Sequence, residues 1–504
     1  MCSSDLVTES ASSPAARPAL RVAVIGGGIT GLAAAHRLVS QSATVQVVLL
    51  EASRRLGGII RTEAADGYLM ELGPDSFITN KPAALQLCDA VGFSDQLIPT
   101  DARFRRSLVL RNGTPMQVPD GFMLMAPSKP WAILKSPILS LGGKLRLLSE
   151  VFVARRTTGG DESLASFVRR RFGQETLERL VQPLAGGIYT ADPEKLSLRA
   201  TMPRFPEMEE SHGSVIRATL AQMKTDRTST SGSGNKHDDS SGSGARYGLF
   251  ATAAGGLSEL ISAIEQALKK SGRVATQLAA PVKSIEKPTA TCPKWMVRPG
   301  DDKAMTFDAV IVTLSTHIAA RLLQDSISPE LSAALRAIEY ASSAVVVSGH
   351  RLSGFSHPMD AFGLVIPAVE KRKVLAVSFS SRKFPNRAPD GQILLRTFVG
   401  GAMQPELLDH DNDAIAGFVN DELRAIFGMT SEPLFSEVIR YENAMPQYHV
   451  GHLDRVTRIE AMTAETPGLY LAGSGYRGVG IPDSIANGQA AADQLLTDTH
   501  SERA

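Results

Sequence analysis

A strand, a glycine-rich turn and a helix near the N-terminus constrain this chain most. The run Val22 to Ile25 is apolar and contains β-branched residues, which favours a buried strand. The motif G-x-G-x-x-G follows, and its residues are Gly26, Gly28, Ile29, Thr30 and Gly31. Glycines at these places permit a tight turn, close approach of a pyrophosphate and packing of the helix on the strand. The motif predicts a dinucleotide site, with a glycine-rich turn in an ordinary α/β unit as the alternative.

An acidic residue ends the second strand of the same unit. Val45 to Leu50 forms that strand, and Glu51 follows it, 20 residues after Gly31. A carboxylate at this place accepts hydrogen bonds from a ribose 2′-OH. Because an acid also disfavours a 2′-phosphate, NADP is not expected.

The residues after Glu51 extend the motif. They read Glu51-Ala52-x-x-Arg55-x-Gly57-Gly58, followed by Arg61-Thr62. This extension resembles FAD enzymes of the amine oxidase and protoporphyrinogen oxidase superfamily. The resemblance implies bound FAD, with Arg55, Gly57 and Gly58 along its diphosphate and Ala52 among the contacting residues. No cysteine follows Cys292, so attachment of the flavin through a C-terminal cysteine is excluded, and we expect non-covalent FAD.

Composition excludes several other classes of protein. The 504 residues carry a net charge of +1, which suggests no nucleic acid or other polyanion as partner. Three cysteines and ten histidines show no metal-ligand spacing, so no metal is expected, and Cys88 fits a helical core. Residues 1–20 lack the apolar core of a secretory signal, and no stretch offers 18 uninterrupted apolar residues. We expect a cytoplasmic protein, with the inner face of the cytoplasmic membrane as a peripheral location.

Two segments after the glycine turn resemble family segments near the flavin and the substrate. Gly73, Pro74, Asp75 and Ser76 match the segment that passes under the flavin ring. Farther on, a hairpin built on Asn112-Gly113 follows the basic run RFRRS. In the family an arginine upstream of this hairpin binds a propionate of the tetrapyrrole, which suits a planar guanidinium.

The arginine run leaves that assignment open. Arg106 is the best match, while Arg105 and Arg103 remain candidates because one extra residue precedes the turn. The alternative is a solvated edge without a ligand.

Residues 162–218 resemble protoporphyrinogen oxidases more than other amine oxidases, and so do three later blocks. By this resemblance Gly187 faces the substrate, and Val365 and Phe398 sandwich the macrocycle. Without the family, Val365 and Phe398 would be assigned to the core and Gly187 to a helix-ending turn.

The C-terminal part carries the remaining motifs. By resemblance, Val282 contacts the adenine through its backbone. A strand, a glycine-rich turn and a helix then follow, and the predicted FAD contacts there are Gly473, Ile481, Pro482 and Asp483. Ser474 stands where the family usually has asparagine. His452 lacks a readable partner, so we interpret it as structural, with a general base as the alternative.

Residues 121–141 are apolar with three prolines and two lysines. We interpret them as a helical region packed inside a substrate domain, with docking at a membrane interface as the alternative. Residues 224–245 are polar and rich in serine and glycine, which predicts a flexible surface insertion.

The expected fold is α/β. It comprises an FAD-binding Rossmann-like domain of the amine-oxidase type, a mixed-sheet substrate domain and a helical domain of the membrane-associated type. The expected division is a disordered tail 1–20, FAD-binding segments 21–85, 246–320 and 441–498, substrate and helical segments 86–215 and 321–440, and the insertion 224–245.

The activity implied by the resemblance is oxidation of protoporphyrinogen IX or coproporphyrinogen III to the porphyrin in heme biosynthesis, with O₂ reduced to H₂O₂. The flavin carries the chemistry, and no catalytic side chain is assigned. Expected partners are the porphyrinogen, O₂, a peripheral membrane contact and, as an alternative to the monomer, a second copy of the chain. Rival functions are another flavin amine oxidase, a carotenoid desaturase, or a flavin-free binding or chaperone protein on the same fold.

Overall fold

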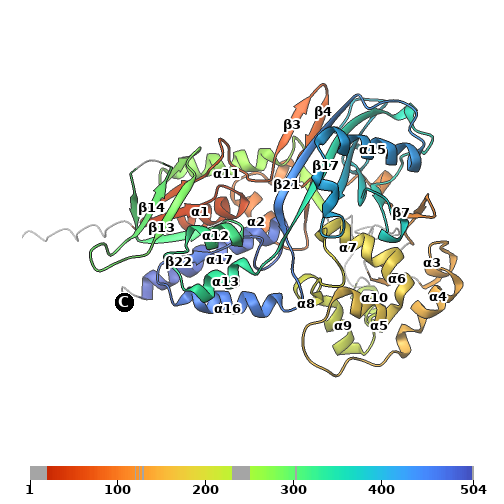
Figure 1. The fold of residues 1–504 in the computed structure, drawn as a ribbon, viewed down its shortest axis with the longest axis horizontal. Helices are drawn as coiled ribbons and strands as arrows, with labels where there is room; N and C mark the ends of the chain where they lie inside the picture. The colour runs from red at the N-terminus through yellow and green to blue at the C-terminus, as the bar shows by residue number, and fades with distance from the viewer. Residues whose placement is uncertain are drawn as a thin grey trace, which may run out of the picture.

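The computed structural model describes residues 20–119, 121–123, 125–127, 130–229, 250–300 and 303–501. A parallel sheet lies at one end of the molecule and a larger mixed sheet at the other, with a group of helices beside the mixed sheet (Figure 1).

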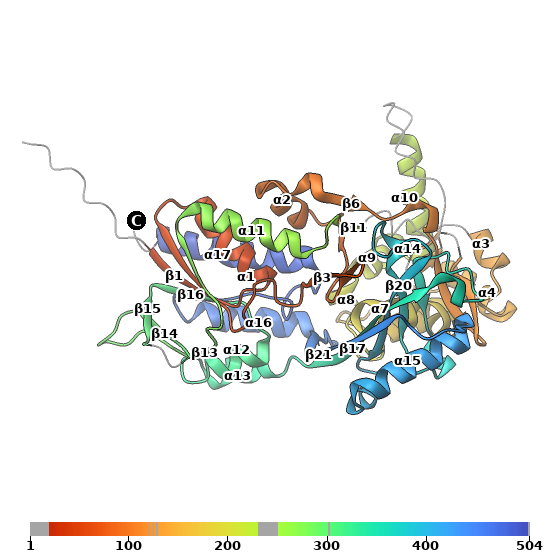
Figure 2. The ribbon, with the colours of Figure 1, turned by 90° about the horizontal axis from the view of Figure 1, so that it is seen from above.

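The parallel sheet has the strand order β12-β2-β1-β16-β22. Its strands are β1 (Leu20–Ile25), β2 (Val45–Leu50), β12 (Val274–Gln277), β16 (Ala309–Val312) and β22 (Leu469–Leu471). Strands β1, β2, β16 and β22 are mostly apolar and largely buried, as strands covered on both faces require, whereas the edge strand β12 is only partly buried. Helices α1 (Ile29–Gln41), α11 (Ser258–Ser271) and α17 (Ile481–Ser501) contribute to the core on one face (Figure 2).

The other face of the parallel sheet packs against a small antiparallel sheet. Its strands are β13 (Val282–Glu286), β14 (Trp295–Pro299) and β15 (Met305–Phe307). Trp295 and Phe307 fill this layer, and both are almost fully buried. The parallel sheet is therefore built from three separated segments of the chain.

The mixed sheet has the order β21-β17-β20-β19-β18-β7-β8. Its strands are β7 (Ser107–Arg111), β8 (Thr114–Gln117), β17 (Tyr340–Arg351), β18 (Gly363–Val365), β19 (Ala376–Phe379), β20 (Gln392–Gly400) and β21 (Phe435–Pro446). One face packs on α15 (Asn412–Phe427). The opposite face meets the hairpin of β3 (Thr62–Ala65) and β4 (Tyr68–Glu71) at one side and the helical group at the other.

The helical group lies between the two passages of the chain through the mixed sheet. It contains α3 (Pro130–Lys135), α4 (Leu141–Leu148), η3 (Ser149–Phe152), α5 (Leu164–Phe172), α6 (Gln174–Thr176), η4 (Leu177–Val181), α7 (Gln182–Tyr189), α8 (Leu198–Thr201), α9 (Arg204–His212) and α10 (Val215–Ser229). Ser163 caps α5, because its hydroxyl oxygen accepts a hydrogen bond from the Ser166 amide at 3.2 Å.

The remaining helices and strands complete the described chain. They are β5 (Phe77–Ile78), β6 (Leu97–Pro99), β9 (Phe122–Met123), β10 (Ala126–Pro127), β11 (Phe250–Ala253), α2 (Ala83–Ala90), α12 (Thr316–Leu322), α13 (Pro329–Arg336), α14 (Ser380–Lys383) and α16 (His452–Ala464), with 3-10 turns between them.

One sequence prediction was partly wrong. The polar composition after residue 223 predicted a flexible insertion, but Lys224 to Ser229 continue α10. A polar composition by itself does not end a helix, and Lys224 and Arg227 are of types that favour helix. Residues 230–245 of the predicted insertion, and residues 1–19 of the predicted tail, lie outside the described part of the chain.

Each helix in the described ranges is too short or too polar to span a membrane.

Candidate FAD and substrate site

The glycine turn lies at the carboxyl ends of the central strands of the parallel sheet, where ligands bind in such folds. Gly26 has φ +108°, and a Cβ at Gly31 would overlap the Gly26 carbonyl oxygen, so neither position tolerates a side chain. A Cβ at Gly28 would meet nothing within 4 Å. No side chain caps the start of α1. The open glycine and the uncapped helix start form a cradle that fits a diphosphate.

The Glu51 carboxylate is held at the edge of this cradle. Its Oε2 accepts a hydrogen bond from the Gly27 amide at 2.6 Å, and its Oε1 accepts one from the Ser53 amide at 2.8 Å. Each oxygen keeps a further lone pair for a ribose hydroxyl. Ala52 next to it is exposed.

The Arg55 to Gly58 loop folds over the glycine turn. A Cβ at Gly58 would lie 3.2 Å from Gly28 Cα, so the two glycines touch. The Arg55 guanidinium donates to the carbonyl oxygens of Leu56 and Ile60 at 3.2 and 2.9 Å and to that of Gly58 at 2.6 Å. Arg55 therefore holds the shape of the loop, and its contact with a diphosphate stays a prediction.

The later FAD motifs reach the same edge of the sheet. The Ala280 amide donates to the Glu51 carbonyl at 2.9 Å, which brings Val282 close to the cradle. Gly473, with φ +141°, follows β22. Ile481 and Pro482 start α17, and the Asp483 carboxylate accepts from the Lys81 ammonium at 2.6 Å.

The predicted flavin segment lies between this loop and the mixed sheet. A Cβ at Gly73 would overlap the Ile59 carbonyl oxygen, so the two backbones are in contact. Pro74 and Ser76 are half-buried, and the side chain of Asp75 is 13% exposed. Asp75 forms ion pairs with Lys383 and Arg396 of the substrate sheet region.

The predicted substrate residues meet on one face of the mixed sheet. Strand register places Phe398 opposite Ala376, and Ala376 opposite Val365. Phe398 and Val365 therefore stand in one row, two strands or about 10 Å apart, with the small Ala376 between them. A Cβ at Gly187, on α7, would lie 3.7 Å from Val365 Cγ1. The structure thus brings Gly187, Val365 and Phe398 together. Ala376 was not predicted as a site residue, because no motif in the sequence includes it.

The three candidate arginines differ in their partners. Arg103 pairs with Asp101 at 2.6 Å. The Arg106 Nε donates to the Asp360 carbonyl at 2.7 Å, and its Nη2 pairs with the Asp360 carboxylate. Among the described residues, Arg105 has no hydrogen-bond or ion-pair partner, and its Nε is buried. Arg105 is therefore the arginine that remains available for a substrate carboxylate.

Four charged residues near these arginines and Asp75 were not predicted from the sequence. Asp360 and Arg382 lie beside the arginine run, with the Arg382 guanidinium 4.8 Å from the centre of the Phe104 ring. Lys383 and Arg396 contact Asp75. Their only signal was their position inside or beside blocks that match the family.

His452 is fully buried, and its ring stacks on Tyr448 with centroids 3.8 Å apart. Its Nε2 donates to the Tyr476 carbonyl oxygen at 2.8 Å, because a carbonyl can only accept. Burial lowers the pKa of His452 to about 4, so the ring is neutral at pH 7. These contacts agree with a structural role and favour it over a general base.

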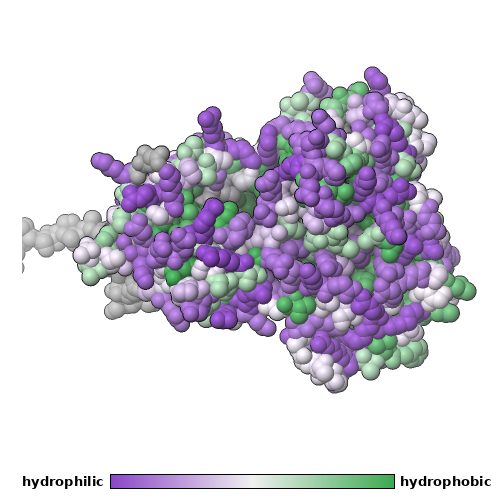
Figure 3. Space-filling model, in the orientation of Figure 1, coloured by the Kyte–Doolittle hydropathy of each residue, from purple (hydrophilic) through white to green (hydrophobic). Residues whose placement is uncertain are grey.

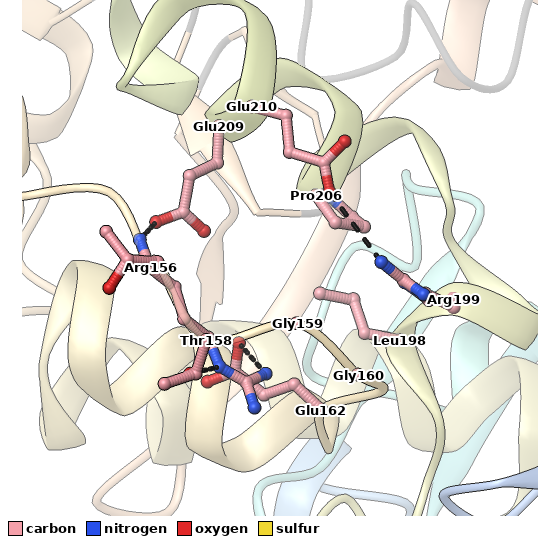
Figure 4. Close-up of a pocket in the computed structure, with 11 residues that line it drawn as sticks. Arg156, Thr158, Gly159, Gly160, Glu162, Leu198, Arg199, Pro206, Glu209 and Glu210 are labelled. Atoms are coloured by element: carbon pink, nitrogen blue, oxygen red, sulfur yellow. Dashed lines mark hydrogen bonds and ion pairs between the residues drawn. The ribbon is translucent and has the colours of Figure 1, made fainter.

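A separate small pocket lies in the helical group (Figure 4). It measures about 170 Å³ and is lined by Arg156, Arg199 and three glutamates, among other residues. Arg156 pairs with Glu162 at 3.3 Å, and Arg199 pairs with Glu210 at 3.7 Å. Because its charges pair with one another and no predicted site residue lines it, we assign this pocket no ligand.

Comparison with known proteins identifies the family. Residues 29–496 match the model of flavin containing amine oxidoreductases. A coproporphyrinogen III oxidase of Bacillus subtilis (strain 168) is 33% identical, over 94% of this chain and 98% of that protein. A mitochondrial protoporphyrinogen oxidase of Nicotiana tabacum is 27% identical, over 95% of both chains.

A solved structure supports the same assignment. The crystal structure of a protein from Exiguobacterium sp. 255-15, proposed to be a protoporphyrinogen oxidase, superimposes with a TM-score of 0.82 at 27% identity. It covers 95% of this chain and 99% of that one. This chain therefore belongs to the flavin containing amine oxidoreductase family, and its cofactor is FAD.

Proposed function

We propose that this protein oxidises a porphyrinogen to the porphyrin in heme biosynthesis, with O₂ as the electron acceptor and H₂O₂ as the second product. The observation that carries the proposal is the row of Phe398, Ala376 and Val365 beside the cofactor segment, in a chain whose relatives are named for porphyrinogen oxidation. Six hydrogens leave the macrocycle in three two-electron steps, each of which reduces one O₂ to H₂O₂.

The FAD site would be held by the residues that form the cradle. Gly26, Gly28 and Gly31 fit the diphosphate, and Glu51 fits the ribose. When bound, FAD supplies the acceptor for the hydride that leaves the substrate carbon. The chain itself binds and orients the substrate and excludes water, and no side chain is assigned as a base.

The row on the mixed sheet suits a flat ring standing on the sheet. Phe398 and Val365 are half-buried, whereas Ala376 between them is small. A spacing of about 10 Å between strands two apart leaves room for one ring in van der Waals contact with both side chains. Ala376 then forms the floor on which the edge of the macrocycle rests.

The arginine cluster suits the propionates of the substrate. Arg103, Arg105, Arg106 and Arg382 outnumber Asp101 and Asp360, which leaves an excess of two positive charges. Arg105 is the one of the three candidate arginines without a partner among the described residues. We therefore assign the first propionate contact to Arg105, with Arg106 held beside it by Asp360.

We propose coproporphyrinogen III as the preferred substrate. The Bacillus relative named for coproporphyrinogen III shares 33% identity with this chain, and the tobacco relative named for protoporphyrinogen shares 27%. The decisive test is growth of porphyrin fluorescence in air with each porphyrinogen, against an enzyme-free control. Faster growth with coproporphyrinogen III is expected, whereas no growth from an FAD-loaded protein would favour another amine oxidase or a desaturase.

An exposed apolar surface on the helical group suits a membrane. Trp131, Leu141, Leu145 and Phe152 are 75%, 75%, 64% and 85% exposed, and hydrophobic side chains gather over α3 and α4 (Figure 3). Lys135 and Arg155 flank them and are exposed as well. An aromatic and aliphatic surface edged by cations fits an anionic bilayer.

The membrane proposal is tested by sedimentation with phosphatidylglycerol vesicles. The double variant Trp131→Ser, Phe152→Ser should stay in the supernatant, while the wild type sediments. The paired change Leu220→Ser, Leu434→Ser, at partly exposed leucines elsewhere, is the matched control. Equal sedimentation of wild type and double variant would contradict the proposal.

A further inference from the structure

Three charged side chains meet where the predicted flavin segment touches the mixed sheet. The Lys383 ammonium lies 2.9 and 3.1 Å from the two carboxylate oxygens of Asp75, and Arg396 Nη1 lies 3.3 Å from Asp75 Oδ2. Burial alone would raise the pKa of the Asp75 carboxyl, but Lys383 and Arg396 hold it well below its usual range. Two cations therefore share one ionised carboxylate.

The neighbouring charges do not cancel this excess. Arg387 is buried and donates to the carbonyl oxygens of Ala253 and Ala254, and the carboxylates of Glu71 and Glu259 lie near it. Glu259 is exposed, so solvent screens its charge. Arg387 and Glu71 add one positive and one negative charge. Burial raises the pKa of Glu71, so protonation there would increase the positive excess. The buried charges of the cluster thus keep one uncompensated positive charge, because the remaining carboxylate, Glu259, is exposed to solvent.

Arg396 also carries a buried donor without a partner. Its Nη2 donates to the Gly73 carbonyl, and its guanidinium carbon lies 5.5 Å from the centre of the Phe398 ring. Its Nε has no hydrogen-bond partner among the described residues, although the side chain is only 5% exposed. A buried donor without a partner is unfavourable and rare in folded proteins, so it points to a missing acceptor.

The cluster is connected to the FAD cradle by backbone contacts. Arg396 binds the Gly73 carbonyl, Gly73 touches the Ile59 carbonyl, and Gly58 beside it touches Gly28 of the glycine turn. Arg396 also stands next to Phe398 on the face of the sheet assigned to the substrate. The excess charge therefore lies where the cofactor and substrate parts of the site meet.

We infer that Arg396 and Lys383, balanced in part by Asp75, place one positive charge beside the flavin and favour its reduced state. FAD gains negative charge as it accepts electrons, and a preorganised cation in a poorly hydrated site stabilises that charge. The inference rests on the FAD of the proposed function but not on the identity of the porphyrinogen. Arg396 and Lys383 are positioning residues for charge, and no proton transfer is assigned to them.

A purely structural clamp would give a different result. If the three residues only held Gly73 to Ser76 in place, replacing any one of them would shift the reduction potential of the bound FAD in the same direction. If the charges act on the flavin, the direction of the shift in its reduction potential depends on which residue is replaced. Removing a cation disfavours reduction, whereas removing the Asp75 charge leaves two cations and favours it.

The test is the reduction potential of the bound FAD, measured against a reference dye during slow reduction without porphyrinogen. Lys383→Gln and Arg396→Gln should shift the reduction equilibrium about tenfold toward the oxidised form, which is about 30 mV for two electrons. Asp75→Asn should shift it in the opposite direction. Arg396→Lys keeps the charge and should stay near the wild type, as should the control Arg351→Gln at an exposed cation at the end of β17.

Shifts of the same sign for Asp75→Asn and Lys383→Gln, or unchanged potentials in both, would overturn the inference. If Arg396→Gln loses its FAD, those two variants still decide by their opposite signs. A wild-type protein that cannot bind FAD would overturn both this inference and the proposed function. Opposite shifts in a protein that is inactive toward porphyrinogens would support the inference and remove only the proposed substrate.

Discussion

The Gly27 amide donates a hydrogen bond to Glu51 Oε2 at 2.6 Å, across the ends of two neighbouring parallel strands. The turn that would receive the diphosphate thus holds the carboxylate that would receive the ribose. Pre-orientation of this kind lowers the entropy cost of binding, because the carboxylate is already fixed when FAD arrives.

Glu51→Ala should reduce FAD occupancy. Hydrogen bonds to a charged group contribute about 1.5–3 kcal/mol, so the Kd for FAD should rise roughly 10- to 100-fold. Occupancy is read from the ratio of flavin to protein absorbance after dialysis. Glu51→Gln keeps the shape and one acceptor and should lose less. Full yellow colour in dialysed Glu51→Ala would contradict the role.

Arg105→Ala should raise the KM for the porphyrinogen with a smaller effect on kcat. The variant removes a cation that has no protein partner in the described chain. The interaction that is lost is therefore the one with the substrate carboxylate, which weakens substrate binding. About tenfold or more is expected from a charge-assisted hydrogen bond. Arg103→Ala, whose cation already pairs with Asp101, is the matched control. An effect confined to Arg106→Ala would return the role to Arg106.

Ala376→Leu should block the substrate and leave the cofactor in place. The added atoms would fill the space between Phe398 and Val365, whose row Ala376 interrupts. Porphyrinogen turnover should fall at least about tenfold, since overpacking a fitted space costs about 1–3 kcal/mol. FAD occupancy and thermal stability are measured in the same samples. Ala376→Gly should remain active, and full turnover by Ala376→Leu would exclude Ala376 as the floor.

Arg171→Met should destabilise the helical group. Arg171 and Glu150 are fully buried, and the Arg171 Nε lies 2.7 Å from Glu150 Oε1. Removing one partner leaves a buried unpaired charge, which costs about 3–5 kcal/mol. Denaturant unfolding measures this loss. Arg169→Met breaks the exposed pair with Glu194 and should cost less than about 1 kcal/mol. Equal stability of the two variants would refute the prediction.

The buried His452 should make the protein sensitive to acid. Burial lowers its pKa from 6.5 to about 4, so between these values the unfolded chain binds the proton more readily than the folded protein. Stability is therefore lost as the pH falls from 6.5 to about 4, by up to about 3 kcal/mol from this group. His452→Gln keeps a donor for the Tyr476 carbonyl and removes the titration. An equally steep loss in that variant would assign the acid sensitivity to other groups.

The glycine turn and Glu51 could be located from the sequence, whereas the charged partners of the arginine run and of Asp75 could not. The contacts of these residues with FAD and substrate stay predictions. The cradle could be found because Gly26 to Gly31 and Glu51 lie within one strand–helix–strand unit, where spacing along the chain sets spacing in space. The helix through Ser229 was missed because composition does not mark where an established helix ends. Arg106 is the best match to the family pattern, and the choice among Arg106, Arg105 and Arg103 stays a prediction, because the sequence does not show the partners of each arginine.

The sequence alone determined the family, the dinucleotide cradle and the residues that match its motifs, because those features are local and periodic. Only the tertiary structure showed that Arg106 pairs with Asp360 and that Lys383 pairs with Asp75. It also showed that Ala376 lies between Phe398 and Val365. Asp75 and Lys383 are 308 residues apart in the chain. Contacts across such separations depend on strand register and on how the two sheets meet, and no spacing rule along the chain encodes them.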